Sequence, residues 1–228
     1  MSDRILEVKD LKKAYFKRII FDKVNFTISQ GEIVGIVGAN GCGKSTILRI
    51  LAGADKPSSG TIEYFGQNPF KNRELFTRYA GYIPQDNPLF NNLTVLDNMK
   101  LWYCDSSADI EPIMNRFGLK PYAKYAVRKL SGGMKKRLSI ACSIANNPPL
   151  LILDEPGASL DIVCKSDICS YLSEYRANGG TVIITSHEEN ELSLCDRMLL
   201  IENTDIREIK PATGNELMKL ISKEGIHA

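Results

Sequence analysis

The residues best suited to chemistry in this sequence form one glycine-rich motif, Gly38-Ala-Asn-Gly-Cys-Gly-Lys-Ser45. Its spacing fits G-x-x-x-x-G-K-[ST], in which the glycines let the backbone curl so that N–H groups point at phosphate oxygens. Lys44 would place a positive charge near the β- and γ-phosphates, and the Ser45 hydroxyl would ligate Mg²⁺. The helix expected after the motif adds unpaired N–H groups and a positive dipole end. The motif predicts a nucleoside triphosphate site.

A second part of such a site is an apolar strand that ends in an acid. The run Leu150-Leu-Ile-Leu-Asp-Glu155 has this form. Asp154 at the strand end would hold Mg²⁺, and Glu155 would polarise an attacking water. Alone the pattern is weak, because buried strands often end in Asp. Together with the phosphate motif it predicts a triphosphatase.

Further motifs indicate which kind of triphosphatase this is. Leu130-Ser-Gly-Gly-Met134 resembles the signature sequence, most often LSGGQ, of the ATP-binding cassette (ABC) family, and it lies upstream of Asp154-Glu155 as in that family. The resemblance covers nearly the whole chain. It includes the aromatic loop at Tyr15, the Q-loop at Gln85, the D-loop at Ser159-Leu-Asp161 and the switch histidine at His187. It implies ATP and Mg²⁺ as cofactors and an ATP hydrolase coupled to membrane transport.

The resemblance implies a functional role for each matched residue. For each of them a purely structural role remains an alternative. Tyr15 would stack on adenine, although from the residues alone a strand aromatic packed in the core explains it better. Gln85 would reach Mg²⁺ and the attacking water, or would be an exposed loop residue. In the family, the residue at the position of His187 hydrogen-bonds the γ-phosphate and keeps the base, here Glu155, and water aligned. A lone histidine after an apolar strand is usually structural, but this strand is expected to end where strand ends converge on the nucleotide.

The signature segment implies a second protein chain. Ser131 precedes two glycines and an expected helix, so it is predicted to be an N-cap, and bare N–H groups there would form a second anion site. In the family this site serves the γ-phosphate of ATP held by a partner. Asp161 would lie across that interface and help position Ser159, or would cap the helix that starts at Ile162. The resemblance therefore implies two cassettes, identical or related, in a head-to-tail ATP sandwich beside transmembrane permease subunits.

The expected site falls into three overlapping groups. The catalytic residues are Glu155, His187, Gln85 and Lys44, and the metal ligands are Ser45, Gln85 and Asp154. The nucleotide-binding residues are Tyr15, Gly38, Asn40, Gly41, Cys42, Gly43, Lys44, Ser45, Thr46, Ser131, Gly132, Gly133 and Asp161.

Three residues prompt separate expectations. Met134 replaces the usual Gln of the signature, a change that main-chain binding would tolerate and that occurs among exporter-type cassettes. Gly157 stands where the family commonly has Thr, which predicts a looser loop. Cys42 lies among inward N–H groups beside Lys44, which predicts a lowered pKa and a reactive thiol, with an inert loop residue as the alternative.

The bulk composition limits where the chain works. Net charge is +2, from 29 basic and 27 acidic residues, which is too balanced to predict nucleic-acid binding. No apolar run reaches the about 18 residues of a membrane span, and the N-terminus does not resemble a signal peptide. We expect a cytoplasmic chain held at the inner face of the membrane by its partners, with its six cysteines as free thiols.

Rival functions fit the motifs less well. A soluble ABC ATPase acting in translation or DNA metabolism is the main alternative, but such proteins usually carry two cassettes or long insertions. A GTPase is disfavoured because the sequence has no N-K-x-D guanine motif, and a kinase would leave residues 130–133 unexplained. The intact Lys44, Asp154, Glu155 and His187 argue against a non-hydrolysing regulatory subunit. Met134, the short segment after the last expected strand and the exporter-like residues 185–197 favour export.

Short apolar segments that alternate with helical ones predict an α/β fold, a P-loop NTPase core with a mixed, largely parallel sheet and an N-terminal antiparallel region. The core would comprise residues 1–86 and 148–228, and an α-helical subdomain would span about 87–147. We expect strands at residues 5–8, 14–16, 25–29, 33–37, 61–65, 150–154, 181–185 and 197–202. We expect helices at residues 44–52, 94–103, 110–117, 134–145, 162–177 and 215–223.

Overall fold

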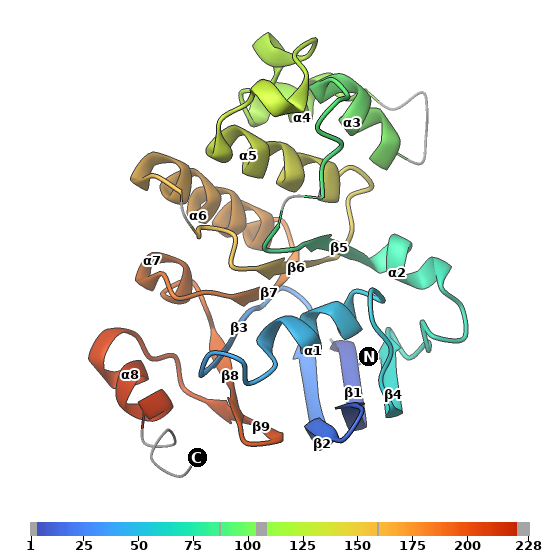
Figure 1. Ribbon diagram of the computed structural model, residues 1–228, viewed down its shortest axis with the longest axis vertical. Helices are drawn as coiled ribbons and strands as arrows, with labels where there is room; N and C mark the ends of the chain where they lie inside the picture. The colour runs from blue at the N-terminus through green and yellow to red at the C-terminus, as the bar shows by residue number, and fades with distance from the viewer. Residues whose placement is uncertain (1–3, 87, 104–108, 159, 223–228) are drawn as a thin grey trace.

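Two sheets make up the β-structure of the residues that the structure describes (Figure 1). The computed structural model describes residues 4–86, 88–103, 109–158 and 160–222. The larger sheet has six strands in the order β5-β6-β7-β3-β8-β9. The strands are β3 (Ile33–Gly38), β5 (Ala80–Ile83), β6 (Leu150–Asp154), β7 (Thr181–Thr185), β8 (Arg197–Glu202) and β9 (Asp205–Ile209). Only β9 runs antiparallel to its neighbour, so the expected, largely parallel α/β sheet is confirmed.

The smaller sheet is antiparallel and has the order β2-β1-β4, with β1 (Arg4–Tyr15), β2 (Arg18–Ser29) and β4 (Ser59–Tyr64). This confirms the antiparallel N-terminal region but corrects its strands. Residues 5–8 and 14–16 are not separate strands, because β1 runs through both and Phe16 lies in the following turn. The pairing continues across register shifts and a left-handed Asp10 (φ 47°), which interrupt the alternation that the sequence pattern relies on.

The helices gather on either side of the sheets. They are α1 (Lys44–Leu51), α2 (Glu74–Tyr79), α3 (Val95–Trp102), α4 (Glu111–Arg116), α5 (Gly132–Ser143), α6 (Ile162–Ala177), α7 (Glu189–Leu192) and α8 (Gly214–Ser222). Short 3-10 turns lie at Lys120–Tyr122 and Val127–Lys129. Helices α3, α4 and α5 lie together at one end of the molecule, and α1 lies apart from them in the lower half of the view, beside β1 and β2 (Figure 1).

The six-stranded sheet is apolar on both faces, and its side chains divide between two cores. Val34 and Ile36 of β3 pack with α1 and the smaller sheet, whereas Ile33 and Val37 pack with residues of α3, α5 and α6. Successive side chains of a strand point to opposite faces, so a strand covered on both sides becomes a continuous apolar run. This explains why all six residues of β3 are buried.

The parallel strands bring their carboxyl ends to one edge of the sheet. Asp154, the last residue of β6, pairs with Thr185, the last residue of β7, and Ile36 near the end of β3 pairs with Thr185 on the other side. The phosphate motif, the acid pair and the segment that carries His187 all leave the sheet at this edge. Residues far apart in sequence can therefore form one site there.

Candidate functional site

The glycine-rich loop between β3 and α1 is closely packed. Gly38, Gly41 and Gly43 have φ angles of 154°, 77° and 117°. A Cβ on Gly38 would lie 2.8 Å from Cys42 Sγ and 2.9 Å from the Ile201 carbonyl oxygen, and one on Gly43 would lie 2.7 Å from Ile20 Cγ2. Gly38 and Gly43 therefore have neither the backbone conformation nor the space for a larger residue, whereas Gly41 has open space and is restricted by its φ angle alone.

The loop leads directly into the start of α1. Gly43 is the N-cap of α1 and no side chain caps the helix, so its first N–H groups are left to other acceptors. Lys44 is buried, and its Nζ donates to the carbonyl oxygens of Gly38 (2.9 Å) and Ala39 (3.2 Å). Asn40 and Ser45 are exposed and Thr46 is half-buried. A helix start and a lysine folded over one loop form a cradle for an anion such as phosphate.

Cys42 lies inside this cradle, and the prediction of a lowered pKa is wrong. Burial raises the pKa of the Cys42 thiol, and the charge of Lys44 with nearby backbone N–H groups only partly offsets that effect. Desolvation of a thiolate outweighs the local positive field here. Cys42 is half-buried in the packed loop, and this burial decides the direction of its pKa shift.

The acid pair follows β6, and Thr185 holds both residues. Asp154 is buried, and its Oδ1 accepts a hydrogen bond from Thr185 Oγ1 at 2.7 Å. The Glu155 N–H donates to the Thr185 carbonyl oxygen at 3.0 Å and lies 3.1 Å from Thr185 Oγ1. Glu155 has a φ of 46°, a strained left-handed conformation for a residue with a side chain. The strand end thus turns sharply and sends the two carboxylates in different directions.

Gln85 and His187 both reach the Glu155 carboxylate. Gln85 Nε2 donates to Glu155 Oε2 at 3.1 Å, and His187 Nε2 lies 3.5 Å from Glu155 Oε1. The three residues come from segments that follow β5, β6 and β7, and the His187 side chain is 54% exposed. The structure therefore brings together three of the four predicted catalytic residues, beside the edge at which the phosphate loop begins. This arrangement can orient a water for general-base attack.

Lys136 is a residue of this site that the sequence did not single out. It lies on α5 and is buried, and its Nζ donates to the carbonyl oxygens of Pro84 (3.3 Å) and Gln85 (3.4 Å). Burial lowers the pKa of Lys136, while the charges of Glu191, Asp154 and Asp86 act in the opposite direction. The ammonium therefore connects the signature helix to the backbone that carries Gln85. A lysine in a helix gives no sequence signal of burial.

Glu191 on α7 is a second such residue. It is buried, accepts a hydrogen bond from Ser186 Oγ through Oε2, and has no hydrogen-bond partner on Oε1 within the described residues. Burial raises the pKa of Glu191, which the hydrogen bond from Ser186 and the charges of Lys165 and Lys136 partly counter. Its carboxylate lies beneath Gly157, in the turn that follows Glu155.

The signature segment has the local structure expected of it. Ser131 is the N-cap of α5, and its hydroxyl accepts from the Met134 N–H at 3.3 Å. Ser131 and Gly132 are exposed, and a Cβ on Gly133 would lie 2.5 Å from Cys164 Sγ. Asp161 caps α6 by accepting from the Cys164 N–H at 2.8 Å. Both predicted caps are confirmed, while Ser159 lies outside the described residues.

The signature segment does not lie with the phosphate loop in a single chain. Ser131 begins α5, which Figure 1 places in the group of helices away from α1. Ser131 and Gly132 are exposed at the start of this helix.

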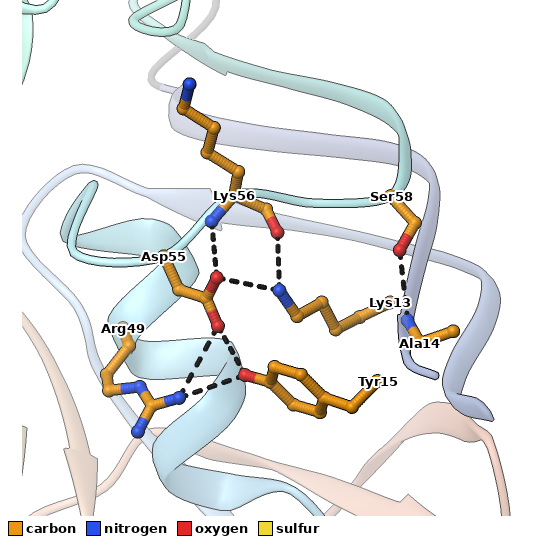
Figure 2. A network of polar contacts seen from close by, with 7 residues as sticks. All are labelled: Lys13, Ala14, Tyr15, Arg49, Asp55, Lys56 and Ser58. Atoms are coloured by element: carbon orange, nitrogen blue, oxygen red, sulfur yellow. Dashed lines mark hydrogen bonds and ion pairs between the residues drawn. The ribbon is translucent and has the colours of Figure 1, made fainter. Parts of the chain in front are cut away.

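Tyr15, at the end of β1, is not a packed core aromatic. Its side chain is 37% exposed, and its hydroxyl contacts Asp55 and accepts from Arg49 Nη2 at 2.9 Å (Figure 2). The nearby hairpin tip touches the phosphate loop, where Arg18 Nη2 donates to the Gly41 carbonyl oxygen at 3.2 Å. The packed-aromatic explanation of Tyr15 is therefore wrong.

The cysteines are reduced wherever the structure describes them. Cys42, Cys142, Cys164, Cys169 and Cys195 are free thiols, and Cys104 lies outside the described residues. Among the described residues no cluster of three or more His, Cys, Asp or Glu side chains could hold a metal by itself. The same part of the chain has no helix with the length and apolar content to span a bilayer.

Comparisons with known proteins agree with this geometry. A family model described as ABC transporter matches residues 21–158. The chain is 39% identical over 191 residues to the lantibiotic transport ATP-binding protein SrtF of Streptococcus pyogenes, with 82% of each protein covered. It is 34% identical over 210 residues to the Nod factor export ATP-binding protein I of Sinorhizobium fredii, covering 89% of this chain and 61% of the relative.

Similarity extends to a protein with an import name and to solved structures. The spermidine/putrescine import ATP-binding protein PotA of Spiroplasma citri is 31% identical over 222 residues, covering 92% of this chain and 62% of the relative. A dimeric, post-hydrolysis structure of the ATP-binding cassette MJ0796, bound to ADP and Pi, superposes with a TM-score of 0.82 at 26% identity. That match covers 92% of this chain and 100% of the other.

Proposed function

Because the chain belongs to the ABC transporter family, in which it is an ATP-binding subunit and an ATP hydrolase, we propose that it powers export through partner transmembrane subunits. One observation carries the proposal: Gln85 and His187 converge on the Glu155 carboxylate at the edge where the phosphate loop begins. Such an arrangement is what a hydrolytic site needs, namely a base, groups that orient it, and an anion cradle beside it.

The nucleotide contacts follow from the cradle. Gly38, Asn40, Gly41, Cys42 and Gly43 would offer backbone N–H groups to the phosphates, and Lys44 would turn its ammonium from carbonyl oxygens to phosphate oxygens. Thr46, in the first turn of α1, would add a contact at the same helix start. Tyr15 would take the adenine on its exposed ring.

The donor set suits Mg²⁺. The Ser45 hydroxyl, the Asp154 carboxylate and the Gln85 side-chain oxygen are hard oxygen ligands, and Mg²⁺ is usually held by one or two carboxylates together with substrate phosphates. When bound, the ion would neutralise charge on the phosphates. Glu155 would accept a proton from water, with His187 and Gln85 holding that water and the base in line.

The second half of each site would come from another cassette. The exposed Ser131 and Gly132 and the half-buried Gly133 at the start of α5 provide a helix N-terminus, and Asp161 lies at the start of α6. We propose that two cassettes, identical or related, meet head to tail so that this helix start contacts the γ-phosphate held by Lys44 of the other chain. The related cassette MJ0796 is dimeric with ADP and Pi bound.

The membrane subunits would bind beside the loop that carries Gln85. A groove of about 370 Å³ lies there, lined by residues that include Phe76, Tyr82, Pro84, Pro88, Trp102 and Pro148. It lies between what we treat as the core, residues 1–86 and 148–228, and the helical subdomain at about 87–147. Binding there would hold the chain at the inner face of the membrane and would connect ATP binding to Gln85.

Export is the direction that the relatives favour. The lantibiotic transport and Nod factor export proteins are 39% and 34% identical to this chain, against 31% for the spermidine/putrescine import protein. The alternative of a soluble ABC ATPase in translation or DNA metabolism has no relative among these. Identifying the membrane protein that copurifies with the chain, and measuring the side of reconstituted vesicles to which it moves substrate, would test the direction.

The hydrolytic assignment is tested by replacing the base. Glu155→Gln keeps the size of the side chain but removes the proton acceptor, so we expect at least a hundredfold loss of ATPase activity and accumulation of an ATP-bound dimer in gel filtration. Glu189→Gln, an exposed neighbour on α7, is the control and should stay active. An active Glu155→Gln protein would refute the assignment.

A further inference from the structure

The hydroxyl of Tyr15 belongs to a polar network that joins the end of β1 to helix α1 and to the segment after that helix (Figure 2). The hydroxyl contacts Asp55 Oδ2, and Arg49 Nη2 donates to the Tyr15 oxygen at 2.9 Å. Asp55 also accepts from Lys13 Nζ and from the Lys56 N–H, both at 2.7 Å. The Asp55 carboxylate thus connects the end of β1 with the segment that follows α1.

The network also fixes the plane of the ring. Lys13, two residues before Tyr15 on the same face of β1, is buried and places its Nζ 4.4 Å from the ring centroid. Lys13 is itself held by Asp55 and by the Lys56 carbonyl oxygen at 2.7 Å. A cation over an aromatic face is attractive. The ring is therefore held by its hydroxyl and by one face, while 37% of the side chain stays exposed for a ligand.

The same contacts reach the phosphate cradle. Arg49 lies on α1, five residues after Lys44, and Asp55 follows the end of that helix. Burial works against the charge of Asp55, but the hydrogen bonds from Lys13, Tyr15 and the Lys56 N–H outweigh it and lower the pKa of this carboxyl. Asp55 is therefore ionised at neutral pH, the form that accepts these hydrogen bonds. The network sets the position of the Tyr15 ring relative to helix α1, whose N-terminus is part of the phosphate cradle.

We propose that Asp55 is a positioning residue for the nucleotide, which holds the Tyr15 hydroxyl so that the ring is already placed for the purine when the triphosphate binds α1. This rests on the proposed function, in which Tyr15 stacks on adenine. It goes further because it makes the hydroxyl of Tyr15, and not only its ring, necessary for tight binding. Immobilising one side chain on binding costs about 0.5–1.5 kcal/mol, and an ordered ring avoids that cost.

The test compares variants that remove the ring with variants that only release it. Tyr15→Leu removes the ring, Tyr15→Phe removes the hydroxyl, and Asp55→Asn removes the charge that holds it. Phe16→Leu, at the adjacent and fully exposed aromatic, is the control. Dissociation constants are measured by calorimetry for ATP and for inorganic tripolyphosphate, both in EDTA, and KM and kcat are measured for Mg-ATP.

We expect Tyr15→Phe and Asp55→Asn each to weaken ATP binding and raise KM by about three- to tenfold. Tripolyphosphate affinity and kcat should stay within twofold of the wild type, since the phosphate cradle is intact, and Phe16→Leu should bind ATP as the wild type does. Tyr15→Leu should weaken ATP binding at least as much as the other two variants.

Three other results would overturn the inference. If Tyr15→Leu weakens ATP binding while Tyr15→Phe and Asp55→Asn do not, stacking stands and the positioning role fails. If Tyr15→Leu has no effect, or Phe16→Leu has the larger one, the adenine contact itself is wrongly assigned. If Asp55→Asn weakens the binding of tripolyphosphate as much as the binding of ATP, Asp55 only maintains the fold of this region.

Discussion

Replacing Thr185 with valine would test how far one buried hydroxyl organises the acid pair. Thr185 has no exposed surface, and its Oγ1 donates to Asp154 Oδ1 at 2.7 Å. The Glu155 N–H lies 3.1 Å from Thr185 Oγ1. Valine keeps the branched shape but puts a methyl group where the hydroxyl was. Asp154 then loses its donor in a buried site.

The structure sets the size of the effect. A hydrogen bond to a charged group contributes about 1.5–3 kcal/mol net, and the N–H of Glu155 keeps its second acceptor, the Thr185 carbonyl oxygen at 3.0 Å. We therefore expect Thr185→Val to lower the free energy of unfolding by about 2–3 kcal/mol. With a urea m-value of about 2–3 kcal/mol/M, the midpoint should fall by about 1 M.

A matched control lies on the same strand. Thr181 is also fully buried, and its Oγ1 accepts one hydrogen bond, from the Gly31 N–H at 2.9 Å. Thr181→Val loses one neutral bond and should cost about 1 kcal/mol. Urea unfolding followed by circular dichroism compares the two, and ATPase assays should show a lower kcat for Thr185→Val alone. If the two variants lose equal free energy of unfolding and have equal kcat values, the hydrogen bond to Asp154 contributes no more than the neutral one.

Two further predictions concern the buried charges behind the site. Lys136→Met removes the hydrogen bonds to the backbone at Gln85, and we expect it to lower kcat about fivefold with KM unchanged, as for a barrier raised by about 1 kcal/mol. Lys135→Met on the same helix is the control, and equal kcat values in the two variants would contradict the reasoning. Because burial raises the pKa of Glu191, this carboxyl favours folding below its unfolded pKa of about 4.3, and that contribution is lost as pH rises through the folded value. Urea unfolding at pH 4 and pH 8 should therefore show a larger loss of stability in the wild type than in Glu191→Gln, whereas parallel losses would contradict it.

The parts of the site that the sequence predicted are those whose structure is encoded locally. The phosphate loop is a run of glycines between a strand and a helix, and its conformation follows from residues 38–45 themselves. Ser131 and Asp161 are N-caps, which depend only on the next three residues. The convergence of Gln85 and His187 on Glu155 needed the family's order of motifs, because nothing in a loop glutamine predicts its partner.

The parts that the sequence missed depend on burial. Thr185 would pass as an ordinary strand residue, and Lys136 as a solvated helix residue, yet both are buried against the acid pair or the loop that carries Gln85. Cys42 shows the same limit in the opposite direction, because its local field favours the thiolate while its burial, a tertiary property, disfavours it. The length of β1 was missed because pairing with β2 and β4 sustains it across irregular register.

Gly157 illustrates how such a departure from the family pattern is accommodated. The sequence predicted a looser loop where the family commonly has Thr. In the structure the Glu191 carboxylate takes the space that a side chain at position 157 would need. The Gly157 backbone therefore lies close to this carboxylate, and the loop is packed at this point. The carboxylate comes from the helix that follows His187, and the loop follows Glu155. A side chain restored at position 157 would therefore have to displace Glu191, and through Ser186 would disturb the segment that places His187.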